Sequence, residues 1–149
     1  MKITFSTNNI TGKLLATRHH RTKCKYDKRG IYQLTCPTCN KKYIGQTERT
    51  LKIRFQEHFR DFKQGNRKSS FAQHLLENGN SIGTMEDVMK TVQITNKCQM
   101  MDTLERFYIF RETKTNNQIN DRMTVKSNII FDTIARKDPY RGLPNTYSA

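Results

Sequence analysis

The chain of 149 residues lacks long apolar stretches. No apolar run approaches the roughly 18 residues that a membrane-spanning helix needs, and the N-terminal segment lacks the apolar centre of a secretory signal peptide. The chain also contains no internal repeat and no low-complexity tract. These absences predict a soluble, intracellular protein with no membrane partner.

Acidic residues are scarce relative to basic ones. The chain has 27 Lys and Arg against 13 Asp and Glu, which gives a formal net charge of +14. Such an excess is typical of proteins that bind nucleic acid, although a solvated basic surface has the same composition. The length suits one compact core and not two. We therefore expect a single domain with a polyanionic partner.

Cysteine is also sparse. The four cysteines are Cys24, Cys36, Cys39 and Cys98, and a disulfide framework is not expected in an intracellular protein. Cys36 and Cys39 have the C-x-x-C spacing of a metal knuckle. A redox role is disfavoured because this pair lies between two predicted strands, whereas the thioredoxin-type pair lies at a strand-to-helix junction.

Composition divides the chain into three parts. Residues 1–29 are basic and have almost no periodic apolar residues, which predicts a poorly ordered arm. Residues 30–123 contain the patterned segments and form the predicted domain. Residues 124–149 are predicted to form a C-terminal tail with one short apolar turn, Ile129-Ile130-Phe131.

Three segments are predicted to be strands: residues 30–36, 42–47 and 87–95. The first two form a hairpin across the Cys-Pro-Thr-Cys-Asn turn. Strict alternation places Tyr32, Leu34 and Cys36 on one face of the first strand, while Tyr43 and Gly45 share a face of the second.

Three helices are predicted from apolar periodicity. The first contains the stripe Leu51, Phe55, Phe59 and Phe62, with Arg54 and His58 at its edge. A short second helix begins with a capping box at residues 70–73 and stops at Asn78-Gly79. The third spans residues 100–112.

Glu105 lies inside the apolar arc of the third helix, between Met101 and Tyr108 on one side and Ile109 on the other. A lone carboxylate there would be costly. It must pair with a cation, accept several hydrogen bonds or bind a metal, and an internal ion pair is the commonest of these arrangements.

The residues with chemical potential follow one another in a characteristic order: Gly30-Ile31-Tyr32, Tyr43-Ile44-Gly45, Arg54, His58, Glu105 and Asn120. In order, spacing and residue type this series resembles the GIY-YIG endonuclease family. The resemblance implies an α/β domain with a small, mainly antiparallel three-stranded sheet flanked by helices. It also implies an enzyme, an endonuclease that hydrolyses phosphodiester bonds in DNA.

The resemblance assigns a role to each side chain. Tyr32 would orient the attacking water or, as a phenolate, deprotonate it. Tyr43 would hold the water or the phosphate. Arg54 suits the phosphoryl oxygens, because its planar fork donates two parallel hydrogen bonds and keeps its charge. His58 would pass the proton, and Asn120 would position backbone or phosphate at the rim.

Glu105 stands at the metal-ligand position of the family. With Arg54, His58 and the two tyrosines expected nearby, metal binding becomes the favoured role of this carboxylate. Hard divalent cations prefer oxygen ligands, so the cofactor is expected to be Mg²⁺ or Mn²⁺ held by Glu105, water and substrate phosphate.

The C-x-x-C pair points to one subgroup of this family. Cys36 and Cys39 between the two strands, with His74 downstream, resemble the endonuclease domain of Penelope-like retroelements, where this hairpin carries half of a two-Cys, two-His zinc site. The resemblance covers most of the chain after residue 29. In the related pattern a second His follows His74, but this chain has Asn80 at that position.

The missing histidine leaves two alternatives for the hairpin. Cys36, Cys39 and His74 form an incomplete zinc site, to which His58, Cys24 or Cys98 would have to add a ligand, since structural zinc usually has four. Otherwise the hairpin is metal-free and its thiols are reduced.

Three functions agree with these observations. The first is a retroelement-derived nickase acting in the nucleus. In related elements a reverse transcriptase domain precedes the nuclease, and these 149 residues contain none. The second is a catalytically silent, zinc-dependent nucleic-acid-binding remnant. The third is a structure-specific DNA repair nuclease that recognises branched DNA.

Overall fold

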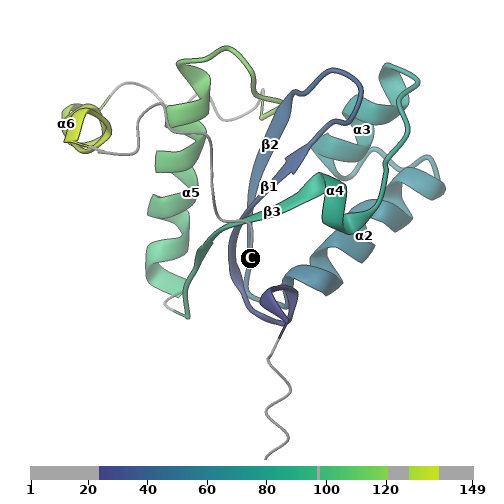
Figure 1. Ribbon diagram of the computed structural model, residues 1–149, viewed down its shortest axis with the longest axis horizontal. Coiled ribbons are helices and arrows are strands. Elements are labelled where there is room, and N and C mark those ends of the chain that lie inside the picture. Colours follow the sequence, from purple (N-terminus) through teal and green to yellow (C-terminus); the bar gives the residue numbers. More distant parts are fainter. Residues whose placement is uncertain (1–23, 97, 121–127, 138–149) are drawn as a thin grey trace, which may run out of the picture.

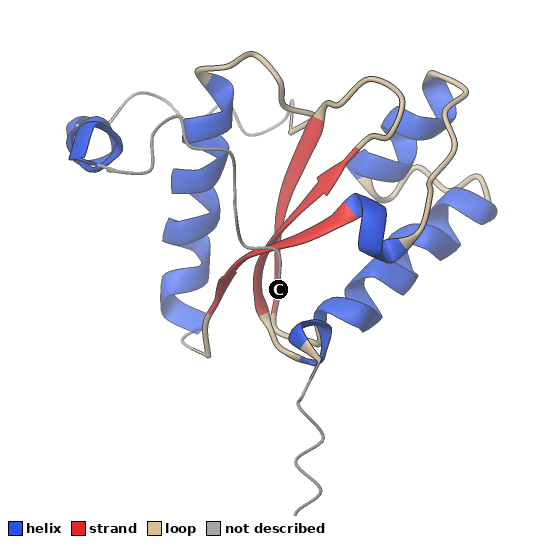
Figure 2. Cartoon of the chain, viewed as in Figure 1, coloured by secondary structure: helices blue, strands red, loops and turns tan. Residues whose placement is uncertain are grey.

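A three-stranded sheet lies between two groups of helices in the computed structural model, which describes residues 24–96, 98–120 and 128–137 (Figures 1 and 2). The elements in chain order are η1 (Lys25–Asp27), β1 (Gly30–Thr35), β2 (Lys42–Thr47), α2 (Leu51–Lys63), α3 (Ser70–Glu77), α4 (Met85–Val88), β3 (Met89–Ile94), α5 (Cys98–Thr113) and α6 (Ile129–Lys137). Helices α2 and α3 lie on one side of the sheet and α5 on the other (Figure 1). Within the described segments, no helix is both long and apolar enough to cross a membrane.

The sheet has the order β2-β1-β3, and both strand pairs are antiparallel. Tyr32 in the central strand pairs with Gly45 of β2 and with Thr91 of β3. A bulge interrupts the β1–β3 register between Ile31 and Tyr32. The predicted α/β fold, a small antiparallel three-stranded sheet flanked by helices, is confirmed.

Alternation along β1 supplies two cores, one on each face of the sheet. Tyr32 and Leu34 are fully buried on the face covered by α2 and α3. Ile31 is buried on the opposite face with Met101 and Ile109 of α5. The predicted division of β1 between two faces is therefore confirmed, and each core closes over the sheet from its own side.

Two glycines permit close approaches in the sheet. A Cβ on Gly45 would lie 2.5 Å from Oη of Tyr32 and 2.6 Å from its Cζ, so the tyrosine ring packs directly on this glycine. Gly30 has φ +149°, and a Cβ there would lie 2.1 Å from the carbonyl oxygen of Gln93. Both tripeptides thus need their glycine for packing.

Helix starts are set by hydroxyl caps. The Thr50 side chain accepts from the backbone N–H of Ile53 to begin α2. The cap of α3 is Ser69, one residue before the predicted start of the capping box. Thr84 caps the single turn α4, so the strand that we predicted from residue 87 begins only at Met89.

The predicted arm, residues 1–29, is partly wrong. Tyr26 in η1 is buried, and its hydroxyl donates to the carbonyl oxygen of Met89 at 3.3 Å. Residues 24–29 therefore pack against the domain, because one aromatic anchor compensates for the lack of apolar periodicity. The remainder of the predicted arm lies outside the described residues.

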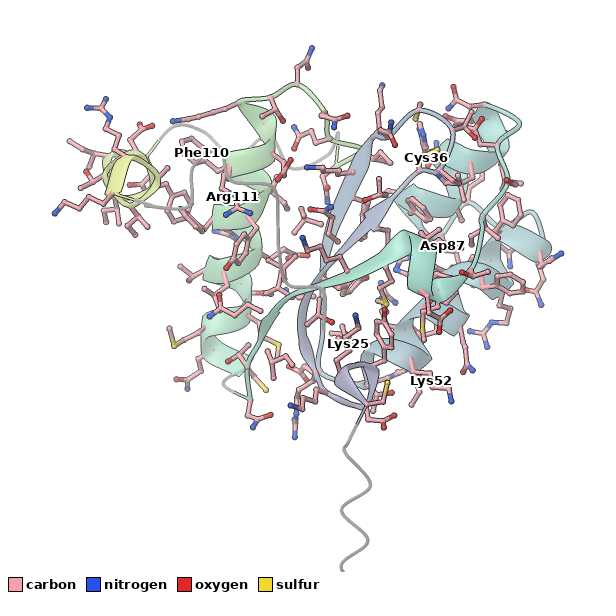
Figure 3. The ribbon with its side chains drawn as sticks, in the orientation of Figure 1. Lys25, Cys36, Lys52, Asp87, Phe110 and Arg111 are labelled. Atoms are coloured by element: carbon pink, nitrogen blue, oxygen red, sulfur yellow. The ribbon has the colours of Figure 1, made fainter. Side chains whose placement is uncertain are left out.

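The predicted apolar turn in the tail is also wrong, because Ile129–Lys137 forms a helix. The ring of Phe131 contacts Phe107 and Phe110 of α5, each at 5.7 Å between centroids. Figure 3 shows Phe110 on the side of α5 nearest α6. Non-local packing on α5 thus extends the short apolar run into a helix, while residues 121–127 and 138–149 lie outside the described residues.

Candidate active site

Tyr32 lies at the centre of the site. It is fully buried on β1, and its hydroxyl contacts two side chains that stand one turn apart on α2. Nε of Arg54 donates to this hydroxyl at 3.1 Å, and Nε2 of His58 lies 2.8 Å from it. The four-residue spacing of Arg54 and His58 therefore brings both to one phenol.

The proton positions follow from the donors available. An arginine nitrogen can only donate, so the hydroxyl of Tyr32 accepts from Arg54 and gives its own proton to Nε2 of His58. The ring proton of His58 then resides on Nδ1, which lies 2.5 Å from Oγ of Ser69. Ser69 also accepts from the backbone N–H of Ala72 as the α3 cap. One chain of hydrogen bonds thus joins α2, β1 and α3.

Burial keeps both central groups neutral. It raises the pKa of Tyr32 well above the ordinary 10.0, and nearby Tyr43 adds to this effect. Burial, together with the Arg54 cation, lowers the pKa of His58 from 6.5 to about 3. The raised pKa favours a protonated phenol over a resident phenolate at Tyr32. His58 is buried rather than at the helix edge. We attribute the difference to α3, which closes over His58 through Ser69.

Tyr43 lies beside this pair on the half-buried surface of β2. Its ring centroid is 6.3 Å from that of Tyr32 and 5.7 Å from that of His58. Burial raises its pKa, and the charge of the Arg54 cation opposes the rise. Tyr43 is the more accessible of the two tyrosines, which suits contact with water or phosphate.

Glu105 reaches the site from α5, on the other side of the sheet. Its half-buried position raises the pKa of the carboxyl, and the nearby Asp102 carboxylate raises it further. Hydrogen bonds from Gln46 and the Arg54 cation oppose this rise. Met101 and Ile109 beside it are buried, as the apolar arc predicted. A half-buried carboxylate of this kind offers the oxygen ligands that a divalent cation prefers.

Asn120 holds the outer edge of β2. Its Oδ1 accepts from the backbone N–H of Ile44 at 3.0 Å, and its Nδ2 donates to the carbonyl oxygen of Ile44 at 2.7 Å. The neighbouring Ile119 N–H donates to the carbonyl of Lys42 at 2.7 Å. Both ends of the Asn120 amide are engaged with backbone, so of its two expected roles this geometry supports backbone positioning.

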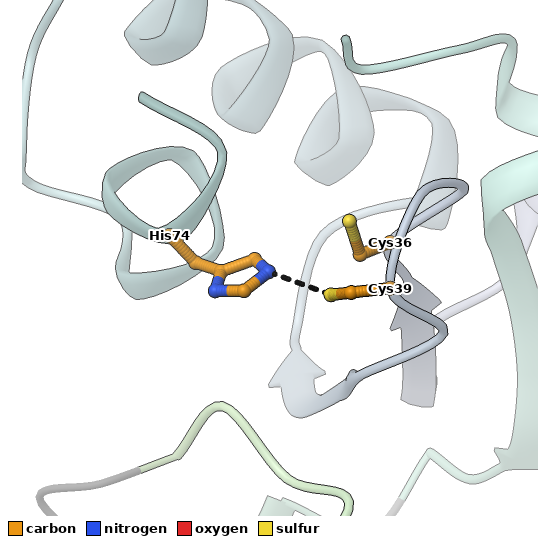
Figure 4. A group of neighbouring side chains, drawn as sticks. All are labelled: Cys36, Cys39 and His74. Carbon is orange, nitrogen blue, oxygen red and sulfur yellow. Dashed lines mark hydrogen bonds between the residues drawn. The ribbon is translucent and has the colours of Figure 1, made fainter. Parts of the chain in front are cut away.

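A second group of side chains lies at the hairpin turn. The ligand atoms of Cys36, Cys39 and His74 all lie within 4.8 Å of one another (Figure 4). Sγ of Cys39 is 3.2 Å from Nε2 of His74, and Nδ2 of Asn80 donates to Sγ of Cys36 at 3.3 Å. The fold thus brings the three predicted ligands together, with Asn80 beside them.

No further His, Cys, Asp or Glu joins this group in the described part of the chain. His58 is engaged with Tyr32 and Ser69, and Cys24 and Cys98 stand apart from the group. Three soft or borderline ligands suit zinc, and among the described residues they leave one position of a tetrahedral shell without a protein donor.

Three residues of the site escaped the sequence analysis: Gln46, Glu57 and Ser69. Ser69 precedes an apolar helical run, so its capping role was detectable, although its contact with His58 was not. Glu57 follows Arg54 by three residues on one helix, which is the spacing of an ion pair. Nothing in the sequence marks Gln46.

A comparison with protein families identifies the domain. The family model of the GIY-YIG catalytic domain matches residues 28–121, which is most of the chain, so the chain belongs to the GIY-YIG family. It is an endonuclease, and the nuclease domain implies DNA as substrate.

Among solved structures, the chain is similar to the catalytic domain of the homing endonuclease I-TevI. The identity is 23%, the TM-score is 0.49, and the match covers 63% of this chain and 100% of that domain. No curated protein sequence matches the chain significantly.

Proposed function

We propose that the protein is a divalent-metal-dependent nickase derived from a Penelope-like retroelement and acting in the nucleus. The observation that carries its activity is the hydrogen-bond chain through Arg54, Tyr32 and His58. Phosphodiester hydrolysis needs a group that accepts the water proton and a hydrogen-bond donor that stabilises negative charge on the phosphoryl oxygens. These three side chains offer both. A catalytically silent remnant would have no need of a complete set of catalytic side chains.

Tyr32 and His58 form a proton relay. The attacking water gives its proton to the hydroxyl of Tyr32, while the phenol passes its own proton to Nε2 of His58, 2.8 Å away. The resulting imidazolium is short-lived because burial disfavours it. Ser69 at Nδ1 holds the ring in the tautomer that can accept at Nε2.

Arg54 binds the phosphoryl oxygens. Its Nε donates to Tyr32 and its Nη1 to Glu57 at 2.7 Å, which leaves the remaining N–H groups of the fork for substrate. About a third of its side chain (34%) is exposed, so a phosphate can reach it. Tyr43 completes the rim of this anion site.

Glu105 would hold Mg²⁺ or Mn²⁺ with water and substrate oxygens. The fit rests on a half-buried carboxylate whose burial disfavours its charge, a cost that a bound cation would offset. When bound, the ion stabilises negative charge on the phosphate and the leaving oxygen.

Cys36, Cys39 and His74 would hold zinc. The three come from the β1–β2 turn and from α3, so the ion would tie the hairpin to the helix whose cap, Ser69, contacts His58. This arrangement and the C-x-x-C motif between the two tripeptides support the Penelope-like origin. A reverse transcriptase, as in related elements, is the expected partner domain.

A plasmid assay tests this function. Supercoiled DNA is incubated with the purified protein and Mg²⁺, Mn²⁺ or a chelator, and nicked and linear products are separated on a gel. We expect nicked circles to accumulate before linear DNA, and only with a divalent cation. Equal cleavage in chelator would contradict the metal dependence, and linear DNA formed directly would contradict nicking.

A further inference from the structure

Glu57 joins two arginines at the edge of the active site. It lies on α2, one turn after Arg54, and its Oε2 contacts Nη1 of Arg54 at 2.7 Å. Its Oε1 forms a short contact with Nη1 of Arg49. The hydrogen bond from Arg54 lowers the pKa of Glu57, and the charges of Arg54 and Arg49 lower it further. The carboxylate is therefore ionised and bridges two guanidinium groups.

Arg49 is anchored at its backbone and open at its tip. Its N–H donates to Oγ1 of Thr47 at 3.1 Å in the turn between β2 and α2. Its side chain is 68% exposed, whereas that of Glu57 is 19% exposed. One end of the Arg49 fork is thus fixed by Glu57, while its other donors face solvent.

Charge argues against a purely structural role for this bridge. An acid next to a phosphate site repels the substrate unless it is neutralised, and two cations around one acid leave the cluster positive. The Arg49 side chain is 68% exposed, and ion pairs to such exposed side chains contribute little to stability. A carboxylate here is more useful as a holder that fixes two guanidinium groups relative to each other.

Arg49 also borders an open groove. A hollow of about 760 Å³ is lined by Arg49 together with Lys28, Arg29 and Thr50. Asp27 and Glu48 also line it, so its three basic side chains leave the lining with a net positive charge. A DNA backbone leaving the active site past Arg49 would enter this groove.

We infer that Glu57 holds Arg49 and Arg54 as a pair that binds two successive phosphates of one strand. Arg54 takes the scissile phosphate, and Arg49 takes its neighbour on the side of the groove. Glu57 is a positioning residue for both. This inference rests on the proposed nuclease function of the same site.

Chemically altered DNA tests the pairing. After the cleavage position of a short duplex is mapped, one phosphate at a time near that position is replaced by an uncharged methylphosphonate. Binding is measured by fluorescence anisotropy, so turnover is not required. For Arg49→Ala we expect about tenfold weaker binding to unmodified DNA. The log–log salt slope should become shallower by about 0.9, the value for one phosphate contact.

The decisive comparison is a double-mutant cycle between protein and DNA. A methylphosphonate next to the scissile position should weaken the wild type by the same factor as Arg49→Ala and should not weaken Arg49→Ala further. Full additivity at every position next to the scissile phosphate would overturn the inference. If no cleavage occurs, methylphosphonates are scanned along the whole duplex. Binding losses that add to that of Arg49→Ala at every scanned position would then overturn the inference.

Variants at Glu57 separate positioning from stability. Glu57→Gln should raise KM and lower kcat, each by roughly tenfold, because both arginines lose their common holder, whereas Arg49→Ala should change KM alone. Arg67→Ala is the matched control, because Arg67 pairs with Glu77 at 4.0 Å and lies outside this cluster. A Glu57→Gln protein with unchanged KM and kcat would contradict the positioning role. Cleavage that fails for every protein would instead count against the proposed function.

Discussion

Oη of Tyr32 and Nε2 of His58 lie 2.8 Å apart in a buried contact that joins the first tripeptide strand to α2. Burial keeps the phenol protonated and the imidazole neutral. A neutral phenol that donates to a neutral imidazole is ready to accept a proton from water while it releases its own. The contact therefore connects the packing of the domain to its expected chemistry.

The depressed pKa of His58 predicts a pH dependence of stability. The folded protein binds a proton at His58 only near pH 3, whereas the unfolded chain binds one near pH 6.5. The unfolded state therefore holds more protons below pH 6.5, and this contribution to stability is lost as pH falls. Between pH 7 and pH 5 the loss should be about 2 kcal/mol.

Urea unfolding of wild type and His58→Gln at the two pH values measures this difference. The variant should be less stable at pH 7 but should lose about 2 kcal/mol less on acidification. The same acid sensitivity in both proteins would show that His58 is not the group responsible.

Glu105→Ala should abolish metal-dependent nicking and leave DNA binding largely intact. The carboxylate is at the expected cation position, and the variant removes a negative charge without touching the basic surface. The plasmid assay with Mg²⁺ or Mn²⁺ gives the activity, and anisotropy gives the affinity. Asp102→Ala is the control acid on the same helix, and its nicking should persist.

Arg54→Ala should reduce turnover about a hundredfold or more, as expected when one donor to the transition state is lost. Arg54→Lys should recover little, because an ammonium cannot contact Tyr32, Glu57 and a phosphate as a planar fork does. Single-turnover cleavage under saturating protein measures both variants. A lysine variant with near-wild-type turnover would show that charge alone suffices.

Asn80→His should raise zinc affinity and, with zinc present, the melting temperature. Nδ2 of Asn80 is 3.3 Å from Sγ of Cys36, so position 80 is adjacent to the three candidate ligands. An imidazole there would complete the shell in the folded state, where metal binding adds to folding free energy. Competition with a chromophoric chelator and thermal melting provide the two readouts.

Cys36→Ser in the Asn80→His background should cancel the gain, because a hydroxyl is a poor substitute for a thiolate on zinc. Tight zinc binding by wild type, unchanged in Asn80→His, would show that another residue completes the site. Absence of zinc from both proteins would indicate a metal-free hairpin.

Removal of residues 1–23 should make the salt dependence of DNA binding shallower. The segment contributes basic side chains to a chain of net charge +14, and each phosphate neutralised adds about 0.9 to the log–log slope. Tyr26 is buried, so the truncation should stop before residue 24 to keep the domain intact. An unchanged slope would assign DNA binding to the folded domain alone.

Much of the fold was predictable because its signals are local. Alternation in 30–36 and 42–47 identified the hairpin and its faces, and periodicity identified α2, α3 and α5 within a few residues, whereas α4 and α6 were not predicted. The position of Glu105 followed from its angle on one helix. The wrong predictions for the N-terminal arm and the C-terminal tail have one cause. Tyr26 and Phe131 pack against partners that are distant in sequence.

The sequence by itself determined which chemical groups this protein has and in what order: two tyrosines on paired strands, Arg54 and His58 one turn apart, and a carboxylate within an apolar arc. It also indicated the candidate zinc ligands. These features depend on residue type and short-range spacing, which the chain carries without folding.

Only the tertiary structure decided the protonation and the partners of these groups. Burial keeps His58 neutral, and its tautomer follows from the hydrogen bond that Arg54 donates to Tyr32. Asn120 is turned to the backbone of Ile44, and Glu57 is shared between Arg49 and Arg54. Burial and hydrogen bonding arise when segments distant in the chain pack together, and the solvation that sets a pKa exists only after they do.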